Sequence, residues 1–286
     1  MSKVISYFVS HINDLYNSIT RLVRGEYTFT IAIAYFMVSF HRLRKWRIYP
    51  RIFTTPDNIK FYLHDPTTLY VNIPDQYVRK EYELHKEYIP RLGWIALDIG
   101  AYIGLYTLRA ARLVGKYGKV IAFEPNPYAW YWLKKNIELN KANNVQLYPV
   151  ALGDKDTVIE FYCVTHGNIG ASSAHREHIM RKPEVNKYLV TYVPMYRLDS
   201  LIPKLLHRDQ HIDLVKIDVE GFELNVLHGA SYTLQKQLIL RLVIEVHLDV
   251  VKERSVIAFL QEYGYKIDKI ASFDHVKKII YAKTAR

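Results

Sequence analysis

The stretch Trp94-Ile-Ala-Leu-Asp-Ile-Gly-Ala-Tyr-Ile-Gly104 decides the fold of this 286-residue chain. An apolar run ends in Asp98, glycines follow at positions 100 and 104, and a helical pattern begins at Leu105. This order predicts a buried strand, a tight turn and the N-terminus of a helix. Because glycine has no side chain, such a turn lets backbone N–H groups approach a ligand closely.

A second apolar run, Lys119-Val-Ile-Ala-Phe-Glu124, also ends in an acid. In nucleotide-binding βαβ units, an acid at this place hydrogen-bonds ribose hydroxyls. A dinucleotide would require G-x-G-x-x-G, but here the glycines are four residues apart and Asp98 would repel a pyrophosphate. An anion suits the ammonium and sulfonium groups of S-adenosylmethionine. The sequence therefore predicts this cofactor, and it disfavours both an NAD-dependent oxidoreductase and an ordinary βα turn.

The net charge and the cysteine content limit the kind of partner and the cellular compartment that we expect. The net charge of +11 predicts an anionic partner such as nucleic acid, an anionic membrane or a phosphorylated substrate, the alternative being a solvated basic surface. Cys163 is the single cysteine, which excludes an internal disulfide and is natural in a reducing compartment. We expect a cytoplasmic protein, with peripheral attachment to a membrane as an option.

Residues 1–48 are predicted to be a helical, apolar and basic extension. Apolar residues from Ile5 to Leu22 recur at three- and four-residue spacing, which is typical of an amphipathic helix. The apolar segment 28–40 is shorter than the roughly 20 residues that a membrane-spanning helix needs, and basic residues flank it. We expect residues 1–47 to bind an anionic membrane surface. Packing of these helices on the catalytic domain or on a second subunit is the alternative.

Two further regions follow this extension. Residues 49–90 form an accessory β-prone region with a charged connecting helix from about 76 to 89, and the main boundary is expected near Pro90. In residues 91–286, strand and helix patterns alternate, which predicts an α/β protein with a mostly parallel sheet. The last two strand patterns, 265–270 and 276–282, are too closely linked for a parallel crossover and should form an antiparallel hairpin. A closing antiparallel hairpin is typical of methyltransferase-type Rossmann-like folds, and the pattern therefore predicts such a fold.

Titratable side chains gather at the predicted ends of two neighbouring strands. Lys216, Asp218 and Glu220 lie on the fourth strand and its exit, beside the expected cofactor. Glu245 and His247 end the next strand. Burying so many ionisable groups is costly, which favours a catalytic site. Helix capping by the two acids and a structural histidine are the alternatives.

Methylation of a hydroxyl needs a base close to its oxygen. His247 is the first candidate, because an ordinary imidazole is neutral and basic near pH 7. Glu245 or Glu220 would orient it, Asp218 is the rival base, and catalysis by alignment alone is the third option. The three acids are hard oxygen ligands, but no metal-binding spacing is present, and we assign no metal.

Six segments together resemble the FkbM family of S-adenosylmethionine-dependent methyltransferases. The resemblance covers roughly residues 80–286, and Lys-Ile-Asp-Val-Glu-Gly is its most specific part. It implies a class I fold, usually with O-methylation of sugar or polyketide-type hydroxyls. The matching segments are Asp98–Gly104, Phe123–Pro127, Asn136–Asn140, Lys216–Gly221, Leu227–Ala230 and Ile244–His247.

The resemblance also implies roles for single residues. Asp98, Gly100 and Gly104 would shape the methionine end of the cofactor site, with Ala101 and Tyr102 between them also on the cofactor. Tyr102 departs from the family, which more often has Asn. Glu124 would bind the ribose, and Ala151 would lie near the adenine. The segment His166–Ser173 resembles an acceptor-side loop, although its glycines equally suit a surface turn.

The expected function is therefore methyl transfer from S-adenosylmethionine to a hydroxyl of a sugar, a glycolipid or another small-molecule or lipid-linked acceptor. One alternative is a nucleic-acid methyltransferase, which the positive charge permits. No Asn-Pro-Pro-Tyr type of base-methylation motif and no basic RNA-binding module support it. The other alternative is a non-catalytic, membrane-associated scaffold, which the intact acids of the two strand ends disfavour.

Overall fold

A computed structural model describes residues 51–65, 68, 72–165, 167–182, 185, 187–207, 210–272 and 275–285. The predicted extension of residues 1–48, with its membrane-binding helix, lies outside these residues. The chain divides into two compact units, Met1–Lys80 and Glu81–Arg286, and each is described by itself. The expected accessory region of residues 49–90 spans this division. No helix in the described part of the chain is long and apolar enough to cross a membrane.

The described part of the first unit contains a small antiparallel sheet. Its strands are β1 (Ile52–Thr54) and β2 (Lys60–Tyr62), and each buries its central phenylalanine. Beyond them lies the π-helix η2 (Pro74–Arg79). The continuous helix predicted for residues 76–89 does not form. Lys80 adopts a left-handed backbone with φ 52°, which interrupts helical hydrogen bonding, and only short 3₁₀ turns follow.

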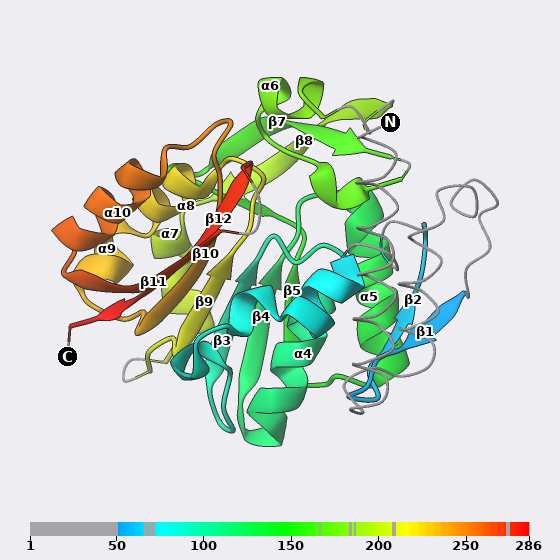
Figure 1. Ribbon diagram of the computed structural model, residues 1–286, viewed down its shortest axis with the longest axis horizontal. Helices are drawn as coiled ribbons and strands as arrows, with labels where there is room; N and C mark the ends of the chain where they lie inside the picture. The colour runs from blue at the N-terminus through cyan, green and yellow to red at the C-terminus, as the bar shows by residue number, and fades with distance from the viewer. Residues whose placement is uncertain are drawn as a thin grey trace, which may run out of the picture. The chain divides into compact units, whose positions relative to one another are not determined.

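The second unit is built on a seven-stranded sheet (Figure 1). The five neighbouring strands β5, β4, β3, β9 and β10 run parallel, and β12 pairs antiparallel with both β10 and β11. The predicted mostly parallel sheet with a C-terminal antiparallel hairpin is thereby confirmed. In spatial order the strands are β5 (Val145–Tyr148), β4 (Lys119–Phe123), β3 (Ile95–Ile99), β9 (Leu214–Ile217), β10 (Arg241–His247), β12 (Lys277–Thr284) and β11 (Tyr265–Ser272).

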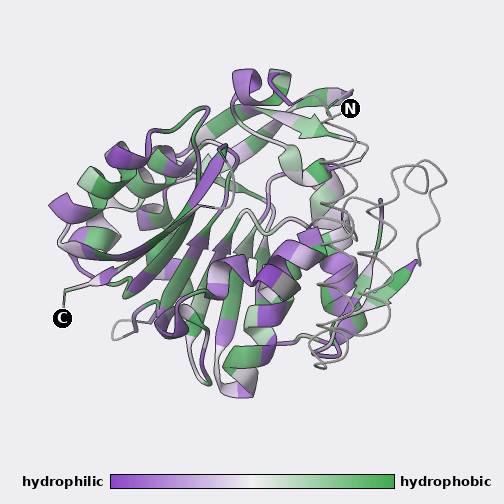
Figure 2. Cartoon of the chain, viewed as in Figure 1, coloured by the Kyte–Doolittle hydropathy of each residue, from purple (hydrophilic) through white to green (hydrophobic). Residues whose placement is uncertain are grey.

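Helices cover both faces of this sheet because alternate residues of its strands are apolar on both sides. Leu97 and Ile99 belong to a core shared with α7, α8, α9 and α10, whereas Ala96 belongs to a core shared with α4. Figure 2 shows the resulting concentration of hydrophobic residues along the central strands. The helices are α4 (Leu105–Val114), α5 (Pro127–Asn140), α7 (Leu198–Leu205), α8 (Glu223–Gly229), α9 (Ser231–Gln235) and α10 (Glu253–Glu262).

An insertion between β5 and β9 adds a second, three-stranded sheet. It has the order β6 (Ala151–Leu152), β8 (Tyr188–Tyr196) and β7 (Thr157–Val164). Between β7 and β8 the chain forms the short helix α6 (Arg176–Met180), which Figure 1 shows beside these strands. β8 and α6 were not predicted from the sequence. They matter for function because α6 supplies a side chain to the candidate site.

Candidate active site

The turn after β3 is forced into its shape by close backbone packing. Gly100 has φ 81°, and a Cβ atom built there would lie 1.8 Å from the backbone oxygen of Asp218. Gly104, with φ 94°, precedes α4 as its N-cap residue. Tyr102 also adopts a left-handed backbone, with φ 52°, a conformation that Asn tolerates better than an aromatic residue. Only glycine at position 100 lets the exits of β3 and β9 meet.

Asp98 is completely buried beneath this turn. The hydroxyl of Thr107 donates to Asp98 Oδ2 over 2.6 Å, and Lys216 Nζ lies 3.1 Å from Asp98 Oδ1. Lys216 Nζ also donates to the backbone oxygen of Gly100 over 2.8 Å. Burial raises the pKa of Asp98, while Lys216 opposes this rise. Lys216, expected in the catalytic set, therefore lies under the glycine turn and braces it.

Glu124 ties the ends of β3 and β4 together. It accepts the N–H of Tyr102 at Oε2 over 2.7 Å and the N–H of Asn126 at Oε1 over 2.8 Å. Burial raises the pKa of Glu124 to about 8. Each carboxylate oxygen has a further lone pair, so Glu124 remains able to accept ribose hydroxyls. Ala151 is buried at the start of β6.

The residues of the turn fit S-adenosylmethionine. The glycine cradle leaves backbone space that a side chain would fill, and an acid stands at the end of β4 for the ribose hydroxyls. Both features lie at the carboxyl ends of parallel strands, where ligands of open α/β sheets bind.

An acid pair lies next to this turn. Tyr82, from η3 (Glu81–Glu83), has its hydroxyl 2.8 Å from Glu245 Oε2 and 3.0 Å from Asp218 Oδ2. Burial and both carboxylates hold the pKa of Tyr82 well above its ordinary value. The side chain of Asp218 is 25% exposed and that of Glu245 is 6% exposed, so Asp218 is the carboxylate that solvent and ligands reach. Sequence reasoning missed Tyr82, since nothing in its segment marks it as part of a site.

His247 lies among three carboxylates. Its Nδ1 is 2.8 Å from Glu223 Oε1, and its Nε2 is 3.2 Å from Glu220 Oε2 and 3.8 Å from Glu245 Oε1. Burial lowers the pKa of His247, but the three carboxylates together raise it to about 10. The expected neutral imidazole near pH 7 is therefore not what this environment favours. The three carboxylates instead favour the protonated imidazolium of His247.

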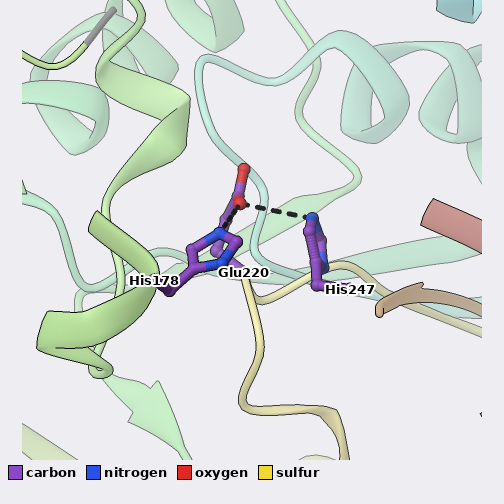
Figure 3. A group of neighbouring side chains, drawn as sticks. All are labelled: His178, Glu220 and His247. Atoms are coloured by element: carbon purple, nitrogen blue, oxygen red, sulfur yellow. Dashed lines mark hydrogen bonds and ion pairs between the residues drawn. The ribbon is translucent and has the colours of Figure 1, made fainter. Parts of the chain in front are cut away.

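A second histidine completes this cluster, as Figure 3 shows. His178 of α6 is 1% exposed, and its Nε2 lies 2.7 Å from Glu220 Oε2. Its Nδ1 lies 2.7 Å from Asp249 Oδ2. Burial raises the pKa of Glu220, but His247, Lys182 and His178 together hold it far below its ordinary value. Neither His178 nor Glu223 was among the predicted residues. His178 was missed because only the fold of the insertion brings α6 to the strand ends, whereas Glu223 lies in the first turn of α8.

The predicted acceptor-side loop touches both halves of the site. Its first residue, His166, lies outside the described part of the chain. Ser172 Oγ accepts a hydrogen bond from Asn126 Nδ2 over 2.7 Å, and the backbone N–H of Asn126 in turn donates to Glu124. Ser173 Oγ donates to the backbone oxygen of Glu220 over 2.7 Å, next to the histidines. The loop therefore bridges the cofactor turn and the acid cluster.

Strand order, glycine turn and strand-end acids define a class I methyltransferase that uses S-adenosylmethionine. A family model described as the Methyltransferase FkbM domain matches residues 98–267. Because this match spans more than half of the chain, the protein belongs to the FkbM methyltransferase family.

The chain is also similar to individual proteins, one by sequence and two by structure. Methyltransferase 1 of Beauveria bassiana (strain ARSEF 2860) is 27% identical over 190 aligned residues, covering 59% of this chain and 74% of that protein. The structure of a SAM dependent methyltransferase from Aquifex aeolicus matches at 16% identity with a TM-score of 0.44, covering 76% of this chain and 93% of that one. The structure of Methyltransferase FkbM from Methylobacillus flagellatus KT matches at 16% identity with a TM-score of 0.47. The match covers 76% of this chain and 54% of that one.

Proposed function

We propose that the protein methylates a hydroxyl oxygen of a sugar, a glycolipid or another small-molecule or lipid-linked acceptor. The observation that carries the proposal is the accessible carboxylate of Asp218 beside the cofactor turn. Lys216 Nζ connects the two, because it lies 3.5 Å from Asp218 Oδ2 and donates to the backbone oxygen of Gly100 over 2.8 Å. A hydroxyl acceptor needs a base at this place to remove its proton as it attacks. A nitrogen acceptor that is already nucleophilic needs such a base less.

Asp218 is the proposed base. S-adenosylmethionine, when bound, supplies an electrophilic methyl group. Asp218 accepts the proton of the acceptor hydroxyl, while Tyr82 and Lys216 hold its carboxylate in position. His247, which carries a proton among its carboxylate partners, suits orientation and charge balance better than proton removal. The overall positive charge favours acceptors that bear phosphate or another anionic group.

The identity of the acceptor is tested with cofactor carrying a deuterated methyl group. Full-length protein is incubated with separated sugar, lipid and RNA fractions, and the products are analysed by mass spectrometry. We expect the label as an O-methyl ether in the sugar or lipid fraction. Label on RNA or on nitrogen would overturn the proposal.

Replacement of the base provides the first mutational prediction. Asp218→Asn should lower turnover by roughly 10²–10⁴-fold with nearly unchanged cofactor affinity, because it removes the proton acceptor and keeps the shape. Asp154→Asn is the matched control, since Asp154 is exposed before β7, and it should retain wild-type turnover. Near-normal turnover of the Asp218 variant on a verified acceptor would show that another group, or none, removes the proton.

A further inference from the structure

We infer that His178, Glu220 and His247 form a binding site for a divalent transition-metal ion of the Zn²⁺ or Co²⁺ class. The three side chains come from α6, from the loop after β9 and from the end of β10. One ligand atom of each lies within 4.8 Å of the others, and the side chains point toward one another in Figure 3. Two imidazoles with one carboxylate are a ligand set that zinc and related first-row metals use.

In both histidines a carboxylate holds the Nδ1 nitrogen, which leaves Nε2 as the nitrogen available to a metal. His247 Nδ1 lies 2.8 Å from Glu223 Oε1, and His178 Nδ1 lies 2.7 Å from Asp249 Oδ2. An ionised carboxylate only accepts, so each Nδ1 keeps a proton, and each Nε2, directed to Glu220, is the nitrogen that binds a metal once its own proton is displaced. Carboxylates bound to the remote nitrogen of a histidine orient it as a metal ligand and make it more basic. A cluster of ordinary ion pairs would not require two histidines that each have a carboxylate on Nδ1 and direct Nε2 to the same oxygen.

Three nitrogen atoms contact the same carboxylate oxygen of Glu220, which indicates where a metal cation would lie. His178 Nε2 at 2.7 Å, His247 Nε2 at 3.2 Å and Lys182 Nζ all contact Oε2 of Glu220. Ligands of a tetrahedral ion with bonds of about 2.1 Å are separated by about 3.4 Å, so each imidazole nitrogen needs to move only slightly away from Oε2 of Glu220. The ion replaces the imidazole protons at this oxygen. The Lys182 side chain, 18% exposed, then turns toward solvent.

A neighbouring set of ligands, Asp218, Glu245 and His247, fits an ion less well. Lys277 Nζ already lies 3.3 Å from Glu245 Oε1. His247 Nε2 is also closer to Glu220 than to Glu245, at 3.2 Å against 3.8 Å. With a single nitrogen ligand, this second set has the oxygen-rich character that magnesium or calcium prefers.

The proposed site lies on the acceptor side of the cluster, because Ser173 of the bridging loop donates to the backbone oxygen of Glu220. Its existence is independent of the acceptor and of methyl transfer itself. Metal binding is therefore measured directly, and a failure of the proposed reaction would leave that measurement unaffected.

The test uses full-length protein stripped with a chelator, dialysed and titrated with CoCl₂. We expect one Co²⁺ per chain, with visible absorption from nitrogen-ligated cobalt, and its displacement by ZnCl₂. His178→Gln should weaken cobalt binding at least 100-fold, which exceeds the loss of an outer-shell partner. Lys182→Met should strengthen it on the order of tenfold, since a competing positive charge is removed. His228 is an exposed histidine in edge-to-face contact with Phe259, and His228→Gln should bind cobalt like the wild type.

The Lys182 variant keeps the test decisive if His178→Gln does not fold, as circular dichroism will show. A mere ion-pair network would lose stability on losing Lys182 and gain no affinity for cobalt. The inference is overturned if wild-type protein takes up no stoichiometric cobalt. Equal binding by wild type and folded His178→Gln, or weaker binding by Lys182→Met, would also overturn it.

Discussion

At the scale of the residue, a comparison of two glycines distinguishes the cost of backbone strain from the cost of close packing. Gly93 and Gly100 have nearly the same left-handed backbone, with φ 83° and 81°. A Cβ atom at Gly93 would meet nothing within 4 Å, whereas one at Gly100 would lie 1.8 Å from the oxygen of Asp218. A substitution at Gly93 therefore reports strain alone, and one at Gly100 reports strain together with the approach of β3 to β9.

We expect Gly93→Ala to lower the free energy of unfolding by about 1–2 kcal/mol, the cost of a left-handed L-residue. Gly100→Ala should cost about 1–3 kcal/mol more through overpacking, and it should abolish cofactor binding because the β9 exit must move. Urea unfolding and calorimetry with S-adenosylmethionine measure the two effects. Equal stability losses with intact cofactor binding in both variants would show that the turn tolerates a side chain.

Glu124 predicts a pH dependence of cofactor affinity. Burial raises the pKa of its carboxyl to about 8, so the ionised fraction that best accepts ribose hydroxyls increases through that pH. Affinity for S-adenosylhomocysteine should therefore rise between pH 6.5 and 9, by up to about 30-fold for one group of this pKa. Glu124→Gln removes the titration and should bind weakly and with a flatter pH profile. Parallel profiles for wild type and variant would assign the dependence to another group.

At the scale of the element, a hydrogen bond from β12 to the backbone helps to hold the η3 turn on the sheet. The hydroxyl of Tyr281 on β12 donates to the backbone oxygen of Glu81, next to Tyr82. Tyr265 on β11 makes a comparable buried bond, because its hydroxyl donates to the backbone oxygen of Ile239 over 2.6 Å. Both tyrosines thus donate a buried hydrogen bond to a backbone carbonyl, and Tyr281 also accepts the backbone N–H of Leu84 over 3.4 Å.

Tyr281→Phe and Tyr265→Phe should each cost about 1–3 kcal/mol of stability, since each leaves a buried carbonyl unpaired. Only Tyr281→Phe should also lower turnover, because the loosened η3 turn no longer holds Tyr82 against Asp218. Thermal unfolding and steady-state kinetics on a verified acceptor distinguish these effects. A matching loss of turnover in the Tyr265 variant would mean that general destabilisation, and not the turn, is responsible.

The elements of the main sheet were predictable because their strands are apolar on both faces and end in recognisable turns. β8 was not, since Pro194 interrupts its pattern and a proline argues against a strand interior. The structure accommodates it because β6 pairs only with Met195 and Tyr196, which leaves Pro194 at a free edge on that side. The helix predicted for residues 222–236 is divided at Ala230 into α8 and α9.

The candidate site was predictable only where its residues follow the strands of the sheet. Asp98, Glu124, Asp218 and Glu245 stand at strand ends, so the fold class alone brings them together. His178 reaches Glu220 across an insertion, and no periodicity in the sequence specifies how such a segment folds back. The charge state of His247 also depends on partners from other elements, which a reference pKa does not include.

At the scale of the whole molecule, the positive charge is unevenly distributed along the chain. Residues 1–48 contain seven basic and two acidic side chains, so nearly half of the net charge of +11 belongs to a sixth of the chain. The same residues contain the predicted amphipathic helix and the apolar segment. We propose that this extension attaches the enzyme to an anionic membrane surface, which would bring it close to a lipid-linked acceptor. Basic residues near anionic headgroups contribute about 1 kcal/mol each.

Vesicle flotation tests this attachment. Full-length protein should float with phosphatidylserine-containing vesicles and much less with phosphatidylcholine vesicles, and high salt should weaken the binding because it screens the charges. A shortened chain beginning at Tyr49 should stay unbound while it retains affinity for S-adenosylmethionine, which shows that the catalytic unit is intact. If both chains float equally, the remaining basic surface is the membrane contact. If neither floats, the extension instead packs on protein, and the oligomeric state of the two chains should then differ.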